Sequence, residues 1–100
     1  MICTLTARRL KPGTYEQFRK TWGPRDAPPA GAERWNPVYV CRDVSDENVV
    51  LTFGMFQGSL DELRAAQREL DDDAQIQAVA PTVEQVLFDG AFEVVEELRS

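Results

Sequence analysis

The chain has no histidine among its 100 residues. Histidine is the usual general base near neutral pH, the commonest zinc and copper ligand, and the usual proximal ligand of haem. Its absence excludes Ser-His-Asp and Cys-His mechanisms and leaves carboxylates alone to form a metal site. The one dense acidic cluster, Asp71 to Asp73, lies at a predicted helix start, where such side chains normally cap the helix in solvent. We therefore predict neither a metal site nor a cofactor.

Several other functional signatures are also absent. The sequence has no phosphate-binding glycine loop, no CxxC pair and no nucleophile elbow. No stretch approaches the roughly twenty apolar residues that cross a bilayer, and the N-terminus does not resemble a secretory leader. The 11 basic residues are scattered among 17 acidic ones, which gives a net charge of −6. These features argue against nucleic-acid and membrane partners, and we expect a cytoplasmic protein.

Only two cysteines are present, Cys3 and Cys41. Both lie in apolar, strand-like runs, where a free thiol usually behaves as a small hydrophobic residue. We predict that both belong to the core, with a disulfide or a reactive thiol as the alternatives.

The composition, with 43% apolar and 28% charged residues, is that of a folded globular protein. One hundred residues suffice for a single domain, which we expect to span residues 1–100. A chain of this size buries only about two-thirds of the surface that it exposes when unfolded, so a monomer would be modestly stable.

Periodicity and capping residues predict four strands and two main helices. The strands are predicted at Ile2–Leu10, Val38–Asp43, Asn48–Phe56 and Leu87–Leu98. In the first strand Cys3, Leu5 and Ala7 alternate with Ile2, Thr4, Thr6 and Arg8. The helices are predicted from Thr14 to Trp22 and from Ser59 to Leu70, with capping boxes formed by Thr14 with Gln17 and by Ser59 with Glu62.

The segments between these elements carry their own signals. The proline-rich run Gly23–Pro37 is predicted to be the one long loop, either functional or poorly ordered. The aspartates Asp71 to Asp73 would start a second short helix, which carries Ile76, Val79 and Ala80. Pro81 would end that helix or begin another turn as far as Val86. Gly90 is expected to mark a bulge or a close backbone approach in the last strand.

The order strand, helix, strand, strand, helix, strand matches the ferredoxin-like βαββαβ unit of the α+β class. It implies a four-stranded antiparallel sheet with strand order 4-1-3-2 and with helices on one face only. In the strand Asn48–Phe56 residues of both parities are apolar, although only one parity can face the helices. We therefore predict that the other face of the sheet pairs with the same face of a second copy, in a near-obligate homodimer.

Aromatic side chains supply the main pattern that points to a binding site. The six that we expect between the sheet and the helices are Tyr15, Phe18, Trp22, Trp35, Phe53 and Phe56. One interpretation is a pocket for a flat apolar molecule, oriented by Asn36, Tyr39 or Arg42. The other is that these aromatics simply fill the core. Arg25, Arg34 and Arg42 could each hold an anion, as any surface arginine could.

Four features together carry a resemblance to a known family. They are the strand Ile2–Leu10 with the helix after it, the strand end Leu51–Phe56, the helix start Gly58–Leu63 and the C-terminal run Phe92–Val95. On these features the chain resembles the dimeric α/β-barrel superfamily, in particular its antibiotic-biosynthesis monooxygenase-like members. The resemblance implies a homodimer whose two sheets pack face to face as a barrel. It also implies one pocket per subunit, between the sheet and the helices.

The resemblance further suggests a chemistry. Some relatives oxidise aromatic, polyketide-like substrates with O₂ and no cofactor, and others degrade haem, a branch that the missing histidine disfavours. Asn, Trp, Tyr and Arg side chains act in the cofactor-independent oxygenases, so the resemblance makes Trp35, Asn36, Tyr39 and Arg42 the catalytic candidates. The expected function is a homodimer that binds a small aromatic or apolar molecule and has monooxygenase-like activity. The alternative is a non-catalytic homodimeric ligand-binding or interaction domain.

Overall fold

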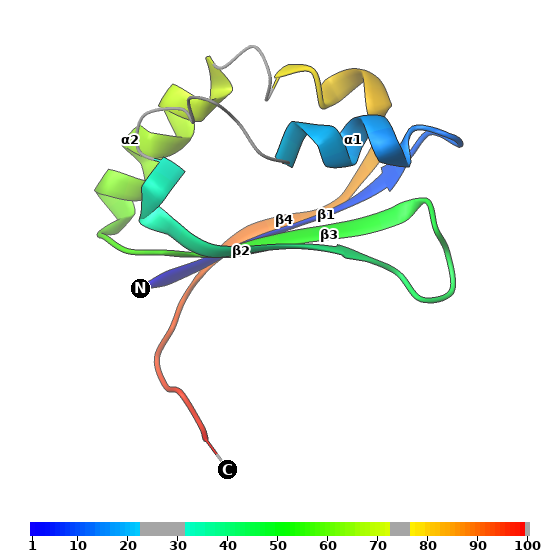
Figure 1. The fold of residues 1–100 in the computed structure, drawn as a ribbon. Helices are drawn as coiled ribbons and strands as arrows, with labels where there is room; N and C mark the ends of the chain where they lie inside the picture. Colours follow the sequence, from blue (N-terminus) through cyan, green and yellow to red (C-terminus); the bar gives the residue numbers. More distant parts are fainter. Residues whose placement is uncertain (23–31, 73–76, 100) are drawn as a thin grey trace.

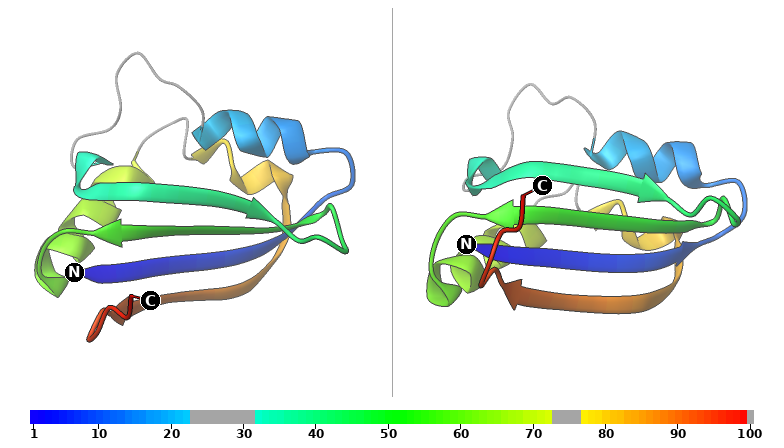
Figure 2. Two further views of the ribbon diagram at one scale, coloured as in Figure 1. Left: turned by 60° about the horizontal axis from the view of Figure 1, so that its bottom comes forward. Right: turned by 90° about the horizontal axis from the view of Figure 1, so that it is seen from below.

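The computed structural model describes residues 1–22, 32–72 and 77–99. Its elements are β1 (Ile2–Leu10), α1 (Tyr15–Trp22), the 3₁₀ helix η1 (Ala32–Arg34), β2 (Trp35–Arg42), β3 (Val49–Phe56), α2 (Leu60–Asp71), the 3₁₀ helix η2 (Ala80–Thr82) and β4 (Val83–Glu93). The strands form one antiparallel sheet in the order β2-β3-β1-β4 (Figure 2), and both helices lie on one face of it (Figure 1). The predicted α+β fold and its strand order 4-1-3-2 are confirmed.

The core beneath the helices consists of two separate clusters. The first packs Ile2, Phe56, Leu63 and Ala66 under α2, with Trp35 and Ala91 against them. The second packs Leu10, Phe18, Val50 and Val79 under α1, with Tyr15, Val40 and Val83 against them. Val50 and Phe56 belong to one parity of β3, so the helix-facing side of that strand is Val50, Thr52, Gly54 and Phe56. The sequence alone did not show which of the two apolar parities of this strand faces the helices, and the structure identifies it.

The opposite side of the sheet, here called the bare face, carries the other parity of each strand. Its residues are Cys3, Leu5, Ala7 and Arg9 on β1, Tyr39 and Cys41 on β2, Val49, Leu51, Phe53 and Met55 on β3, and Gln85, Phe88, Gly90 and Phe92 on β4. The ring centroids of Tyr39 and Phe53 lie 5.0 Å apart, and those of Phe88 and Phe92 lie 5.9 Å apart. Tyr39, Phe88 and Phe92 remain 50%, 46% and 51% exposed, so the bare face is a mostly apolar surface that the described part of the chain leaves uncovered, with Arg9 and Gln85 as its polar residues.

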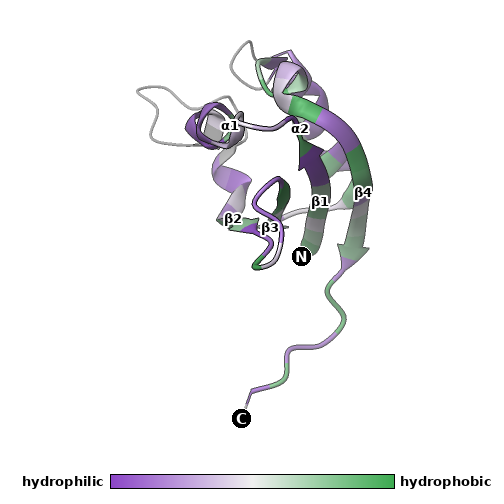
Figure 3. Ribbon diagram, turned by 90° about the vertical axis from the view of Figure 1, so that its right-hand side faces the viewer, coloured by the Kyte–Doolittle hydropathy of each residue, from purple (hydrophilic) through white to green (hydrophobic). Residues whose placement is uncertain are grey.

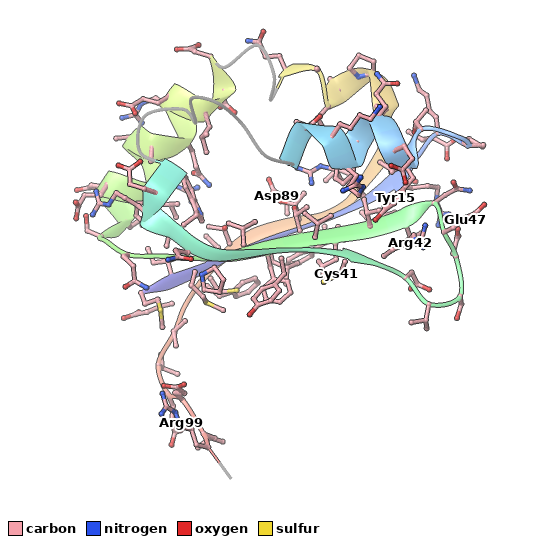
Figure 4. All side chains as sticks on the ribbon, in the orientation of Figure 1. Tyr15, Cys41, Arg42, Glu47, Asp89 and Arg99 are labelled. Atoms are coloured by element: carbon pink, nitrogen blue, oxygen red, sulfur yellow. The ribbon has the colours of Figure 1, made fainter. Side chains whose placement is uncertain are left out.

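The expectation that both cysteines are core residues is wrong. Cys3 and Cys41 are free and only half-buried, because both belong to the bare face. Figure 4 shows Cys41 on the side of the sheet away from the helices. An internal disulfide is excluded by the strand order, since β3 separates the two strands that carry the thiols.

The last strand begins and ends earlier than predicted. It spans Val83–Glu93, and two irregularities in its register with β1 leave Glu84 and Leu87 without an opposite residue. These bulges break the strict alternation of side chains, so that Val83 and Val86, three residues apart as in a helical turn, both lie opposite helix-facing residues of β1, Leu10 and Arg8. Gly90 is not the bulge, because it pairs in regular register with Leu5. Its missing side chain instead gives room to the rings of its two aromatic neighbours on the bare face, which would lie 3.1–3.2 Å from a Cβ atom.

Two other boundaries also differ from the expectation. β2 begins at Trp35, opposite Phe56, and the cis bond Asn36–Pro37 lies within a register irregularity of this edge strand, where proline is tolerated. The predicted loop Gly23–Pro37 is therefore too long, and residues 23–31 lie outside the described residues. α2 ends at Asp71 with Asp72 as its C-cap, whereas residues 73–76, where the predicted second short helix would begin, lie outside the described residues. Gln77, which follows them, is helical.

The starts of the two helices are held in different ways. The capping box of α2 is confirmed, because the Ser59 and Glu62 side chains each accept a hydrogen bond from the other's backbone N–H, at 3.2 and 3.0 Å. At α1 the Thr14 hydroxyl instead donates to the carbonyl oxygens of Lys11 and Thr82, which fastens the helix start to η2. Within the described ranges neither helix has the length and apolar character needed to cross a bilayer.

One arginine extends the capping box of α2. The Arg34 guanidinium lies 2.6 Å from the Glu62 carboxylate, donates to the Gln57 carbonyl at 3.0 Å and lies over the Phe56 ring at 5.0 Å. The backbone hydrogen bond at Ser59, followed by the hydrogen bond from Arg34, lowers the pKa of Glu62 to about 2. The segment before β2 is thereby fastened to the first turn of α2.

We expect Glu62→Gln to weaken the acid sensitivity of the fold. The folded-state pKa of Glu62 is about 2 and lies below the unfolded value of about 4.3, so the carboxylate stabilises the folded state above about pH 5. That stabilisation is lost as the pH falls toward the folded pKa. Urea unfolding across this window should show a larger loss for the wild type than for Glu62→Gln. Asp61→Asn, an exposed position in the same turn, should behave like the wild type, and parallel losses in all three proteins would contradict the assignment.

Candidate functional site

The six predicted pocket aromatics do not line one space. Phe18 and Tyr15 lie in the cluster under α1, whereas Trp35 and Phe56 lie in the cluster under α2 with their ring centroids 4.8 Å apart. Phe53 points away from all of these, because it belongs to the bare face. The side chain of Trp22 lies outside the described residues. Two pairs of aromatics are thus brought together, at opposite ends of the helix-facing side.

The four catalytic candidates of β2 are also spread apart. Trp35 faces the helices, Asn36 is exposed beside the cis bond, and Tyr39 lies on the bare face. Arg42 lies at the far end of the strand, with its guanidinium carbon 4.6 Å from the centre of the Tyr15 ring (Figure 4). Seven residue-to-residue steps along the strand lead from Trp35 to Arg42, a span of roughly 23 Å. No small substrate could contact all four side chains in one subunit.

Polar side chains occupy the space between the two core clusters. On β1 they are Thr4, Thr6 and Arg8, which follow Ile2 of one cluster and precede Leu10 of the other. Thr52 lies beside them on β3 and Asp89 on β4, each in register with Thr6. Figure 4 shows Asp89 on the helix side of the sheet. We call Thr4, Thr6, Arg8, Thr52, Asp89 and the indole nitrogen of Trp35 the polar band.

Hydrogen bonds join the members of the polar band in pairs. Nη1 of Arg8 donates to Oγ1 of Thr52 at 3.0 Å, and Oγ1 of Thr6 donates to Oδ1 of Asp89 at 3.0 Å. The third pair is formed by Nε1 of Trp35, which donates to Oγ1 of Thr4 at 3.0 Å. Gly54 permits this position of the indole, because a Cβ atom there would lie 3.2 Å from Cδ1 of the Trp35 ring.

The electrostatics of the polar band centre on one cation and one anion. Burial lowers the pKa of Arg8, and the nearby Asp89 carboxylate opposes this change by raising it. The guanidinium stays protonated at neutral pH, because arginine is not deprotonated in proteins. Its central carbon lies 5.7 Å from the centre of the Phe18 ring, so the charge has an aromatic face on one side. Asp89 is the exposed member of the band, while Thr52 is almost completely buried.

The polar band has the groups needed to bind a polar ligand and to accept a proton from it. The Arg8 guanidinium is a donor suited to an oxyanion or a carbonyl oxygen, and the Asp89 carboxylate can accept a proton from a hydroxyl group. The threonine hydroxyls can both donate and accept. In the part of the chain that the structure describes, no three His, Cys, Asp or Glu side chains gather as a metal site.

A second feature lies at the other end of β2. An open depression of about 620 Å³ is lined by Tyr15, Arg42 and the hairpin residues Asp43, Val44, Ser45, Asp46 and Glu47. The Asp43 carboxylate accepts hydrogen bonds from the backbone N–H groups of Ser45 and Asp46, so its charge is used to shape the turn. Of the arginines considered as anion holders, Arg34 pairs with Glu62, Arg42 stacks on Tyr15, and Arg25 lies outside the described residues.

Sequence reasoning missed the polar band although its signal was present. In Ile2–Leu10 the apolar parity is Cys3, Leu5 and Ala7, which suggests that this side faces the core. The structure turns it to the bare face and points Thr4, Thr6 and Arg8 at the helices. Ile2 and Leu10 have the same parity as these polar residues, and both are buried. These two large apolar residues at the strand ends are the sequence feature that could have shown that the polar parity faces the core.

Comparison with known proteins supports the fold. No family model and no curated protein matches the chain. The structure is similar to that of a putative antibiotic biosynthesis monooxygenase from Chloroflexus aurantiacus J-10-fl, with a TM-score of 0.69, 14% identity and coverage of 98% of this chain and 96% of that one. An uncharacterized NIPSNAP domain protein from Burkholderia xenovorans gives a TM-score of 0.64 and 17% identity, with 100% of both chains covered. A NIPSNAP family protein from Agrobacterium tumefaciens str. C58 gives 0.65 and 17%, with 96% and 88% covered.

At these identities the comparisons establish a shared ferredoxin-like fold, and not a shared reaction. The resemblance noted in the sequence is confirmed at that level. What the chain binds must be argued from its own side chains.

Within the polar band, we expect Thr52→Val to lower the free energy of unfolding by about 1–2 kcal/mol, because the charged Arg8 guanidinium then loses its nearly buried hydrogen-bond acceptor. Thr6→Val should cost less than about 0.5 kcal/mol, since water can replace its bond to the exposed Asp89. Urea unfolding of both variants, and of each combined with Arg8→Met, gives the coupling energies. Equal costs for the two threonines would contradict the pairing of Arg8 with Thr52.

Proposed function

We propose that the protein is a homodimer in which each subunit binds a small planar molecule, bearing hydroxyl or carbonyl groups, against the polar band. The observation that carries the proposal is the direction of β1. Its polar side chains point toward the helices of their own subunit, at the centre of the sheet, where a purely structural core would be apolar.

The composition of the polar band fits a binding site. Pockets for small molecules have mostly apolar walls and a few polar groups that fix the orientation of the ligand. Here the apolar walls are the two core clusters, with Phe18 near one end of the band and Trp35 at the other. Arg8 and Asp89 supply opposite charges, which suits a ligand with both an electron-rich oxygen and an acidic hydroxyl group.

The bare face supports the homodimer. A monomer would leave its aromatic pairs in water, and covering them with the same face of a second copy removes that exposure. A specific interface buries at least about 1,000 Å² in total. If about 60% of that area is apolar, burial at about 25 cal/mol per Å² contributes roughly 15 kcal/mol before the costs of association. Pairing and folding should therefore be linked.

The activity that fits such a ligand is oxidation of a phenol by O₂ without a cofactor. In the overall reaction the phenol ring loses two hydrogen atoms and gains one oxygen atom as a quinone carbonyl, and the second oxygen atom leaves as water. The substrate itself supplies the electrons. Asp89 would accept the phenol proton, and Arg8 would stabilise the phenolate that remains. The name of the Chloroflexus relative points to the same class of reaction. The rival proposal is a domain that binds the molecule and leaves it unchanged.

For the binding site, we expect Arg8→Met to weaken the binding of dihydroxynaphthalenes at least about tenfold, because a charge-assisted hydrogen bond contributes about 1.5–3 kcal/mol. Quenching of the fluorescence of the two tryptophans reports binding. Arg9→Met is the matched control, since it removes the same charge from the next residue, which lies at the edge of the bare face, away from the polar band, and pairs with Asp46 of the β2–β3 turn. Equal affinity in the two variants would place the site elsewhere.

Oxygen uptake separates the enzyme from the binding domain. With a phenol that quenches the fluorescence, an oxygenase consumes O₂ and forms a quinone, and Asp89→Asn abolishes the uptake. Binding without O₂ uptake by the wild-type protein would favour the non-catalytic domain.

For the dimer, we expect Phe53→Glu to shift the protein from dimer to monomer at micromolar concentration and to lower its melting temperature. The new charge would lie at the centre of the apolar interface without a partner. Val44→Glu introduces the same charge at a fully exposed residue of the β2–β3 turn and should leave the dimer intact. Sedimentation equilibrium gives both masses. A wild type that sediments as a folded monomer of 11.3 kDa would contradict the homodimer.

A further inference from the structure

The residues after β4 leave the folded body of the protein. Val94 to Arg99, here called the C-terminal tail, contain no helix or strand, and their only backbone bond to the sheet among the described residues runs from the Val94 N–H to the Met1 carbonyl, at 3.0 Å. Figures 1 and 3 show the tail running away from β4 into solvent. The predicted last strand therefore ends too late, because its ladder with β1 stops at Glu93.

The C-terminal tail carries apolar residues that the rest of the subunit does not cover. Val95 is 87% exposed and Leu98 is 84% exposed. Along the chain they follow Phe88 and Phe92, the exposed aromatic residues that β4 places on the bare face. The acidic charge between them is partly neutralised, because Arg99 forms an ion pair with Glu97 at 3.1 Å.

The direction of the C-terminal tail indicates which partner it meets. In Figure 1 the helices lie above the sheet and the tail runs below it, on the side of the bare face. In the right-hand view of Figure 2, from the side of the bare face, the tail passes in front of the sheet. A second copy stacked on the bare face would therefore stand beside the tail. By two-fold symmetry each subunit would receive the tail of the other.

We propose that the C-terminal tail of each subunit packs Val95 and Leu98 onto the second copy, so that the two copies hold each other by reciprocal tails. The inference rests on the homodimer proposed above. The tail then becomes part of the interface and extends the apolar contact beyond the sheet. Because four aliphatic side chains are buried per dimer, their loss should weaken dimerisation at least about tenfold.

The test compares two double variants of the full-length chain. Val95→Ser/Leu98→Ser removes the apolar side chains, while Glu96→Ser/Arg99→Ser changes the same number of tail residues without altering the net charge. The dissociation constant from sedimentation equilibrium should rise at least about tenfold in the first variant and stay within about twofold of the wild type in the second. A wild-type constant in the first variant would overturn the inference while leaving the homodimer intact.

A second readout follows the tail itself. Amide hydrogen exchange of residues 94–99 should slow as the protein concentration rises through the dimerisation range, because the tail becomes ordered on its partner. Rapid exchange at every concentration in a sample that sediments as a dimer would overturn the inference. A wild-type chain that remains monomeric would refute the homodimer first, and the inference with it.

Discussion

β1 lies between β3 and β4 at the centre of the sheet, and its alternating side chains point Thr4, Thr6 and Arg8 toward the helices and Cys3, Leu5 and Ala7 away from them. This orientation is fixed at both ends of the strand, because Ile2 and Leu10 are buried in the two core clusters. A shift of one residue would turn every side chain to the other face. The polar interior and the apolar exterior of the sheet therefore have one cause, and any account of the protein must explain both.

The polar interior weakens the subunit. The free energy of the hydrogen bond between Arg8 and Thr52 roughly offsets the free energy that both side chains lose when they leave water. Apolar residues in the same positions would instead add to the stability of the core. The two clusters are also small, and each holds one helix to one end of the sheet. A domain of this size has little stability to spare. Burial of the apolar bare face by a second copy can supply the stability that the polar interior does not.

Much of the fold could be predicted from the sequence, for identifiable reasons. The Ser59 and Glu62 capping box, the Tyr15–Trp22 helix and the alternation of β3 are local patterns, and local patterns determine local structure. The errors occurred where a tertiary contact overrides the pattern. In β4, two bulges interrupt the alternation of apolar residues, so that the sequence of its first half resembles a helical turn. In β2, the pairing of Trp35 with Phe56 extends the strand across a proline.

The candidate site was harder to predict, because aromatic side chains were taken as its signal. Phe18 and Phe56 proved to be the centres of two cores, and Tyr39 and Phe53 proved to stack on the bare face. The residues that the structure brings together are threonines, an arginine and an aspartate from three strands. None of them forms a motif along the chain, since Thr6 and Asp89 are 83 residues apart. Only the pairing of the strands places them side by side.

The two native cysteines provide the most direct test of the account, because Cys3 and Cys41 both lie on the bare face and no substitution is needed to introduce a probe. The measurement is the rate at which a thiol reagent in large excess modifies them, as a function of protein concentration. If a second copy covers the apolar side of the sheet, both thiols react readily in dilute solution and become progressively protected as the concentration rises through the dimerisation range. Rates that do not change with protein concentration would contradict the account, because the apolar side of the sheet would then stay uncovered.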